Sequence, residues 1–206
     1  GALADGLAKN GGSKLKELDL AGNGIGAAGA ERLAALVAVS KSLLKLDLTS
    51  NKLGSSGASA LVSRLGENTA LAALSLRDND IDAAGAAAIA TALKSNGALS
   101  TLWLGKNKIA DDGVIALVDA LLAARNKSKI AYLDLHKNGI TKTGIASLTQ
   151  LVADSPTLAA LGLAGTKMQF TETEVMQSAA KEKPELGRVK AVRLWMGTDM
   201  NKWPDL

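Results

Sequence analysis

The sequence has 206 residues, of which 47% are hydrophobic and only 2% aromatic, and its formal net charge is +4. With no cysteine and one histidine, His136, it offers neither a disulfide framework nor the ligands of a zinc centre. No apolar run reaches the roughly 18–20 residues of a membrane-spanning helix, and the mild basic excess does not favour nucleic-acid binding. We therefore expect a cytoplasmic protein with no cofactor, no metal, and no membrane or nucleic-acid partner.

The chain begins with a short segment that matches half of a repeat. Leu3 and Leu7 have the helical spacing of the aliphatic residues in the units that follow. Residues 1–12 are therefore expected to form a partial N-terminal repeat, if the chain begins inside a longer protein, or a cap on the first complete repeat.

From residue 13 onward, five positions recur at a fixed period. Three aliphatic residues, an asparagine and a further aliphatic residue return after 28, 28, 28 and then 31 residues, and a glycine follows each set. The first set is Leu15, Leu18, Leu20, Asn23 and Ile25, and the fifth is Ile130, Leu133, Leu135, Asn138 and Ile140. Such a period is typical of repeat proteins.

Each unit contains two hydrophobic periods. Its Leu-x-Leu part alternates, as in a strand buried on one face, and its later part repeats at three and four residues, as in an amphipathic helix. A single strand, turn and helix cannot bury its own apolar face. We therefore expect the units to stack into an α/β solenoid, curved, with a parallel sheet on the concave face and helices on the convex face.

The turn residues carry further expectations. The amide of each repeated asparagine is expected to satisfy backbone groups of the adjacent turn, and each glycine to permit close backbone approach at the helix start. Asp82 and Thr141 are expected to be helix N-caps.

The pattern L-x-x-L-x-L-x-x-N-x-[IL]-x-x-x-G-x-x-x-L occurs five times and resembles the leucine-rich repeats of the ribonuclease-inhibitor-like class. The resemblance covers about residues 1–196 and implies the solenoid fold and a mostly intracellular protein. Members of this class share an architecture rather than a site, so the resemblance does not identify a partner.

The last repeats depart from the pattern. Thr166 replaces the asparagine of the sixth unit, and a seventh strand is expected around Val192 and Leu194. The expected organisation is one leucine-rich-repeat domain over residues 1–206, with a partial repeat or cap at 1–12, six repeats over 13–186, and a final strand and C-terminal cap over 187–206.

The C-terminal edge is rich in large apolar residues, namely Trp195, Met196, Met200 and Trp203. A solenoid needs its last apolar face covered, so we expect this edge to fold back as a cap. The alternative is that the edge packs against a second copy of the chain, because an uncovered strand edge promotes association.

Residues between the strand leucines, and those directly before and after them, are expected to face the concave side. Three of the five aromatic residues fall at such positions, beside several charged ones. Because Trp, Tyr and Arg dominate interface hot spots, these positions favour a partner-binding patch; the alternative is simple stacking between neighbouring strands. The predicted patch consists of Arg77, Trp103, Lys106, Tyr132, Asp134, His136 and Trp195.

No catalytic or nucleotide-binding motif occurs in the sequence. Asp134 and His136 are close on one strand, but Ser75 lies two repeats away, roughly 10 Å at normal strand spacing, which is too far for a hydrogen bond. We therefore predict a non-catalytic scaffold that binds an unidentified protein partner on its concave face. The alternative is a self-assembling structural protein that forms homo-oligomers through its C-terminal edge.

Overall fold

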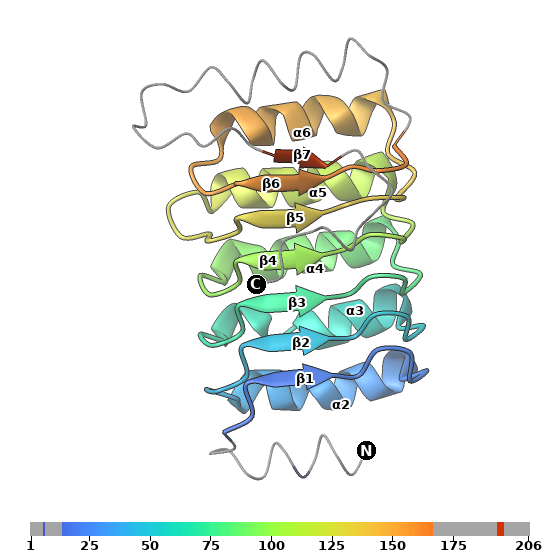
Figure 1. Ribbon diagram of the computed structural model, residues 1–206, viewed down its shortest axis with the longest axis vertical. Coiled ribbons are helices and arrows are strands. Elements are labelled where there is room, and N and C mark those ends of the chain that lie inside the picture. Colours follow the sequence, from blue (N-terminus) through green and yellow to red (C-terminus); the bar gives the residue numbers. More distant parts are fainter. Residues whose placement is uncertain (1–5, 7–13, 167–192, 196–206) are drawn as a thin grey trace.

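One parallel sheet extends along the chain. The computed structural model describes residue 6, residues 14–166 and residues 193–195. Seven strands lie in the order β1-β2-β3-β4-β5-β6-β7, so each pairs with its neighbours in sequence. Figure 1 shows the helices stacked along one side of this sheet, with a helix after each of the first five strands. The predicted α/β solenoid is confirmed.

The strands are short and the helices run behind them. The strands are β1 (Glu17–Asp19), β2 (Lys45–Asp47), β3 (Ala73–Ser75), β4 (Thr101–Trp103), β5 (Tyr132–Asp134), β6 (Ala160–Gly162) and β7 (Arg193–Trp195). The helices are α2 (Gly26–Val39), α3 (Gly54–Val62), the 3-10 turn η1 (Leu65–Glu67), α4 (Ala83–Ser95), α5 (Ala110–Ala123) and α6 (Lys142–Asp154). No helix within the described ranges is long and apolar enough to cross a membrane.

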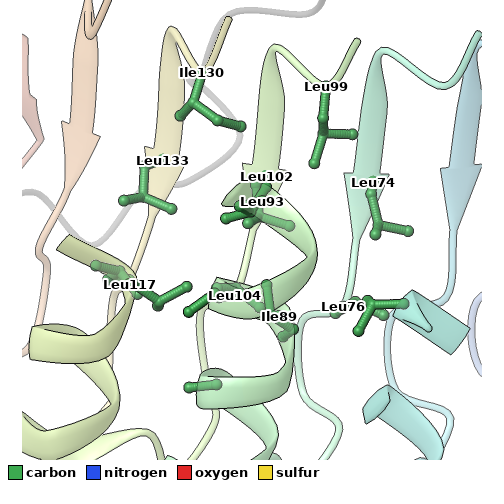
Figure 2. Close-up of a cluster of buried hydrophobic side chains, with 14 of the residues drawn as sticks. Leu74, Leu76, Ile89, Leu93, Leu99, Leu102, Leu104, Leu117, Ile130 and Leu133 are labelled. Carbon is green, nitrogen blue, oxygen red and sulfur yellow. The ribbon is translucent and has the colours of Figure 1, made fainter. Parts of the chain in front are cut away.

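A row of leucines joins the strands to the helices. Leu74 and Leu102 are the central residues of β3 and β4 and pair in register. The three extra residues before β5 leave this register intact, because Leu102 pairs with Leu133. In Figure 2 these leucines lie in one cluster with Ile89 and Leu93 of α4, and all five are at most 2% exposed. Burial of each such side chain contributes about 1.5–3 kcal/mol.

The repeated asparagines form the predicted link between turns. The side-chain oxygen of Asn79 accepts from the backbone N–H groups of Asn51 and Leu53, and its amide donates to the carbonyls of Leu48 and Arg77. One side chain thereby satisfies backbone groups in two repeats. Equivalent bonds are made by Asn51, Asn107 and Asn138.

Two further buried asparagines, which the sequence analysis did not predict, make hydrogen bonds to the turns at the other end of the repeats. Asn68 donates to the carbonyls of Val37 and Ser40 and accepts from the N–H groups of Ala70 and Leu71. Asn96 makes the same set of bonds 28 residues later. Their shared 28-residue period was the signal that could have revealed them.

Both predicted N-cap residues occupy the N-cap position, but only Asp82 makes a side-chain cap bond. Asp82 accepts hydrogen bonds from the N–H groups of Ala84 and Gly85, as an N-cap does. Thr141 is the N-cap residue of α6, as predicted, but its side chain makes no cap hydrogen bond. The start of α6 is instead held by Asp111 of the preceding repeat, which accepts from the N–H groups of Thr141 and Gly144.

The glycine at each helix start is required for close packing, as predicted. At Gly113, a Cβ atom would lie 2.5 Å from Cγ2 of Ile109 and 3.1 Å from the backbone of Ala83 in the preceding helix. Any side chain at this position would therefore push consecutive repeats apart.

Candidate functional site

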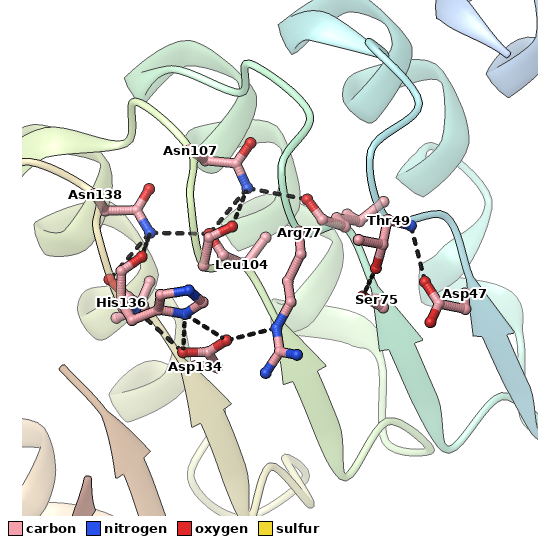
Figure 3. Close-up of polar contacts among 12 residues, drawn as sticks. Asp47, Thr49, Ser75, Arg77, Leu104, Asn107, Asp134, His136 and Asn138 are labelled. Atoms are coloured by element: carbon pink, nitrogen blue, oxygen red, sulfur yellow. Dashed lines mark hydrogen bonds and ion pairs between the residues drawn. The ribbon is translucent and has the colours of Figure 1, made fainter. Parts of the chain in front are cut away.

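Four residues of the predicted patch come together on the face of the sheet that is turned away from the helices, hereafter the open face. Trp103 of β4 pairs in register with Asp134 of β5. Arg77 and His136 each lie two residues after the last residue of their strand, so their side chains point to the same face. Figure 3 shows Arg77, Asp134 and His136 converging from two strands that are not neighbours.

Arg77 spans the gap between β3 and β5. Its Nε donates to Oδ2 of Asp134 at 2.8 Å, and its guanidinium carbon lies 5.9 Å from the centre of the Trp103 ring. An ionised pair and a contact between a cation and an aromatic ring therefore hold the same guanidinium. The Arg77 side chain remains 24% exposed.

His136 secures the other side of Asp134. Its Nδ1 lies 2.8 Å from Oδ1 and 3.0 Å from Oδ2 of the carboxylate, and its backbone N–H also donates to Oδ1. Because a carboxylate only accepts hydrogen bonds, Nδ1 carries a proton in this arrangement. Asp134 is thus fixed between a cation and an imidazole.

The space for this arrangement is provided by Gly105, which sequence analysis did not include among the site residues. Gly105 lies between Arg77 and His136 at the same position of the intervening repeat. A Cβ atom there would overlap Nδ1 and Cε1 of His136 and would lie 2.8 Å from Oδ2 of Asp134. The glycine is therefore what allows the imidazole to lie across β4.

The surface position expected for two patch residues is corrected by the structure. Asp134 is completely buried and His136 is only 3% exposed. Their strand alternation was correct, but Gly105 leaves room for the ring and Arg77 lies over the carboxylate. Asp134 and His136 are therefore positioning residues, which orient Arg77.

The other predicted residues have different surroundings. Trp103 and Tyr132 are half-buried, and Lys106 is exposed in the turn after β4. Trp195 ends β7. The predicted edge residues Met196, Met200 and Trp203 lie outside the described residues. We call Arg77, Trp103 and Tyr132, together with Lys106 in the adjoining turn, the open-face patch.

Polar contacts continue from the patch toward β2. The hydroxyl groups of Thr49 and Ser75 are 2.8 Å apart, and the Asp47 carboxylate accepts from the Thr49 N–H at 2.8 Å (Figure 3). Ser75 thus pairs with Thr49 rather than with His136. Within the described residues no group of three or more His, Cys, Asp or Glu side chains could hold a metal ion.

The turns beside the patch carry paired charges. Nζ of Lys108 lies 2.7 Å from Oδ1 of Asp80. This hydrogen bond and the charge of Lys108 lower the pKa of Asp80, and the same contact raises the pKa of Lys108. The hydrogen bond from Ser55 is the main cause of the lowered pKa of Asp82, with smaller contributions from N–H groups of the helix.

The repeats of this chain match those of known proteins. A family model described as Leucine Rich repeat matches residues 13–34, 39–62, 67–90 and 99–118. No curated protein matches the sequence significantly.

Two solved structures share the fold over most of their length. One is described as leiomodin-1 actin-binding site 2, with 18% identity and a TM-score of 0.59, covering 86% of this chain and 85% of that chain. The other is the tropomodulin C-terminal domain of Caenorhabditis elegans, with 11% identity and a TM-score of 0.55, covering 86% of this chain and 91% of that chain. At these identities the likeness concerns the fold.

Proposed function

The chain belongs to the leucine-rich-repeat family, and on that premise we propose that it is a non-catalytic scaffold that binds a protein partner through its open-face patch. The 28-residue period and the helix in each repeat support the ribonuclease-inhibitor-like class. The proposal treats residues 1–206 as one domain of this kind.

The observation that carries the proposal is the fixed orientation of Arg77 against Trp103. Arg and Trp are the residues that most often dominate binding energy at interfaces. Both project from a regular sheet, and the Asp134 carboxylate already holds the guanidinium. Binding to such a surface requires little ordering of side chains, which favours affinity.

Actin is the first partner to test, because the leiomodin-1 structure is described as an actin-binding site. Co-sedimentation of the full chain with filamentous actin measures this interaction directly. Affinity capture with the full chain, followed by mass spectrometry, tests other partners in the same conditions.

The double variant Trp103→Ala and Tyr132→Ala tests the patch itself. We expect it to weaken binding of the recovered partner by about tenfold or more, as loss of a hot spot does. The matched control is Val39→Ala, which removes an apolar side chain that is 43% exposed in α2, on the helix side. Equal binding by the double variant and the wild type would refute the proposed site.

A further inference from the structure

Beyond the general binding role, we infer that the open-face patch takes an acidic segment of a partner protein, with a partner carboxylate on the guanidinium of Arg77. The inference rests on the proposed function and adds the chemistry of the partner. It follows from the hydrogen-bond donors that the chain leaves unused and from the distribution of charge on the open face.

Arg77 has more donors than this chain satisfies. A guanidinium carries five N–H groups. The Nε–H group is used by Asp134, whereas Nη2 is buried and has no hydrogen-bond partner. An unsatisfied buried donor costs free energy, which an acceptor supplied by a partner would recover.

The direction of these donors is fixed. Asp134 holds the Nε side of the guanidinium, and Trp103 lies against its face. The remaining end of the planar group carries the two Nη atoms, and this end matches the two oxygens of a carboxylate. Because Nη2 is itself buried, a partner carboxylate approaches through the exposed part of Arg77, and a bidentate ion pair requires a shift of the guanidinium that presents Nη2.

A second buried donor lies on the same strand as Trp103. Thr101 is completely buried, and its Oγ1 has no hydrogen-bond partner. Thr101 precedes Trp103 by two residues and so faces the same side of β4. With no exposed surface, Thr101 offers no contact to a ligand, so the patch is reached at the partly exposed side chains of Arg77 and Trp103.

The charges along the open face favour the same ligand. Lys106 and Lys137 are exposed in consecutive turns after β4 and β5, and neither forms an ion pair with another described residue. The buried Asp134 carboxylate beneath the patch is paired with Arg77. Asp78, next to Arg77, is exposed and accepts a hydrogen bond from Ser50.

The first two strands have the opposite character. Glu17, Asp19 and Asp47 accompany a single cation, Lys45, on the open face of β1 and β2. An acidic segment is therefore repelled from β1 and β2 and attracted to β3, β4 and β5, which sets its position along the sheet.

The test uses three fluorescein-labelled peptides, hexaglutamate, hexaglutamine and hexalysine, with the full chain at low ionic strength. Fluorescence anisotropy should show binding of hexaglutamate alone, weakening as salt is added. Arg77→Lys, which keeps the charge and loses the planar fork, should weaken binding about tenfold. Lys94→Gln, on the last turn of α4, is the control that removes a cation elsewhere and should leave binding unchanged.

A second variant covers the case in which Arg77→Lys is poorly folded. The double variant Arg77→Gln and Asp134→Asn removes both charges of the pair, so no unpaired carboxylate stays buried, and it should also lose hexaglutamate binding. Hexaglutamate binding that equals hexaglutamine binding, or that survives both Arg77 variants, would overturn the inference. The scaffold proposal fails separately, if partner binding is indifferent to Trp103 and Tyr132.

Discussion

The imidazole of His136 occupies the space that a side chain at residue 105 would fill, and Gly105 leaves that space open. The two residues hold the same position in consecutive repeats. Because His136 in turn holds Asp134, and Asp134 holds Arg77, this one glycine determines where the cation of the patch points.

Substitution of Gly105 by alanine should therefore disturb both stability and binding. The added methyl group forces the His136 ring to move, and overpacking of this kind costs about 1–3 kcal/mol. Urea unfolding of Gly105→Ala measures the cost. In the double variant Gly105→Ala and His136→Ala the clash with the ring is gone and only the 2.8 Å contact with Oδ2 of Asp134 stays, so the loss should be smaller than the sum of the single losses. Strictly additive losses would show that the two residues do not compete for space.

Substitution of Arg77 and substitution of Asp134 should lower the free energy of unfolding by different amounts. Arg77→Met leaves the buried Asp134 carboxylate with only His136 as a hydrogen-bonding side chain, which should cost up to about 3 kcal/mol, the lower end of the range for buried pairs because Arg77 is 24% exposed. Asp134→Asn should cost less, since Arg77 can turn toward solvent and an amide oxygen can still accept from His136. Denaturant unfolding of both variants compares the two costs, and an equal or larger loss for Asp134→Asn would contradict the asymmetry.

The repeat made most of the fold predictable. The central leucines of β1 to β6 pair at spacings of 28 or 31 residues, and a parallel sheet follows from stacking similar units. The last pair departs from this spacing, because Leu161 pairs with Leu194, 33 residues on, and not with Val192 as the period predicts. The cap at α6 was not predictable from Thr141 alone, because Asp111 reaches it from another repeat. Local sequence shows which hydrogen bonds a residue can make within its own turn. It does not show when a side chain from another repeat makes those bonds instead.

The residues of the candidate site could be predicted from the sequence, but which of them are buried could not. Strand alternation placed Arg77, Asp134 and His136 on one face. Their burial depends on the absence of a side chain at Gly105, in the turn after β4, and that relation appears only when the strands are in register. Sequence analysis therefore found the patch and assigned surface positions to the two residues that support it.

The repeated asparagines should contribute unequally to stability, according to how deeply each is buried. Asn79 is completely buried with four hydrogen bonds to backbone groups, whereas Asn23 is exposed. Asn79→Ala should lower the free energy of unfolding by at least about 1–3 kcal/mol, because buried backbone groups lose their partners. Asn23→Ala, the matched control, should cost clearly less in the same urea titration, and equal costs would argue against burial as the cause.

Acid should weaken the packing of α3 against α4 through Asp82. Hydrogen bonds from Ser55 and from the start of α4 lower the pKa of this carboxyl in the folded chain. A carboxyl with a lowered folded pKa stabilises the protein above its unfolded pKa, near 3.9, and that contribution is lost as the pH falls through the lower, folded value. Urea unfolding between pH 7 and pH 2 should therefore show a shallower loss of stability at the acid end for Asp82→Asn than for the wild type. Ser55→Ala should reduce the acid-induced loss of stability in the same way, and Ser56→Ala, at the exposed next position of α3, should not. Identical losses at acid pH in the wild type and Asp82→Asn would exclude the carboxyl as the source of the effect.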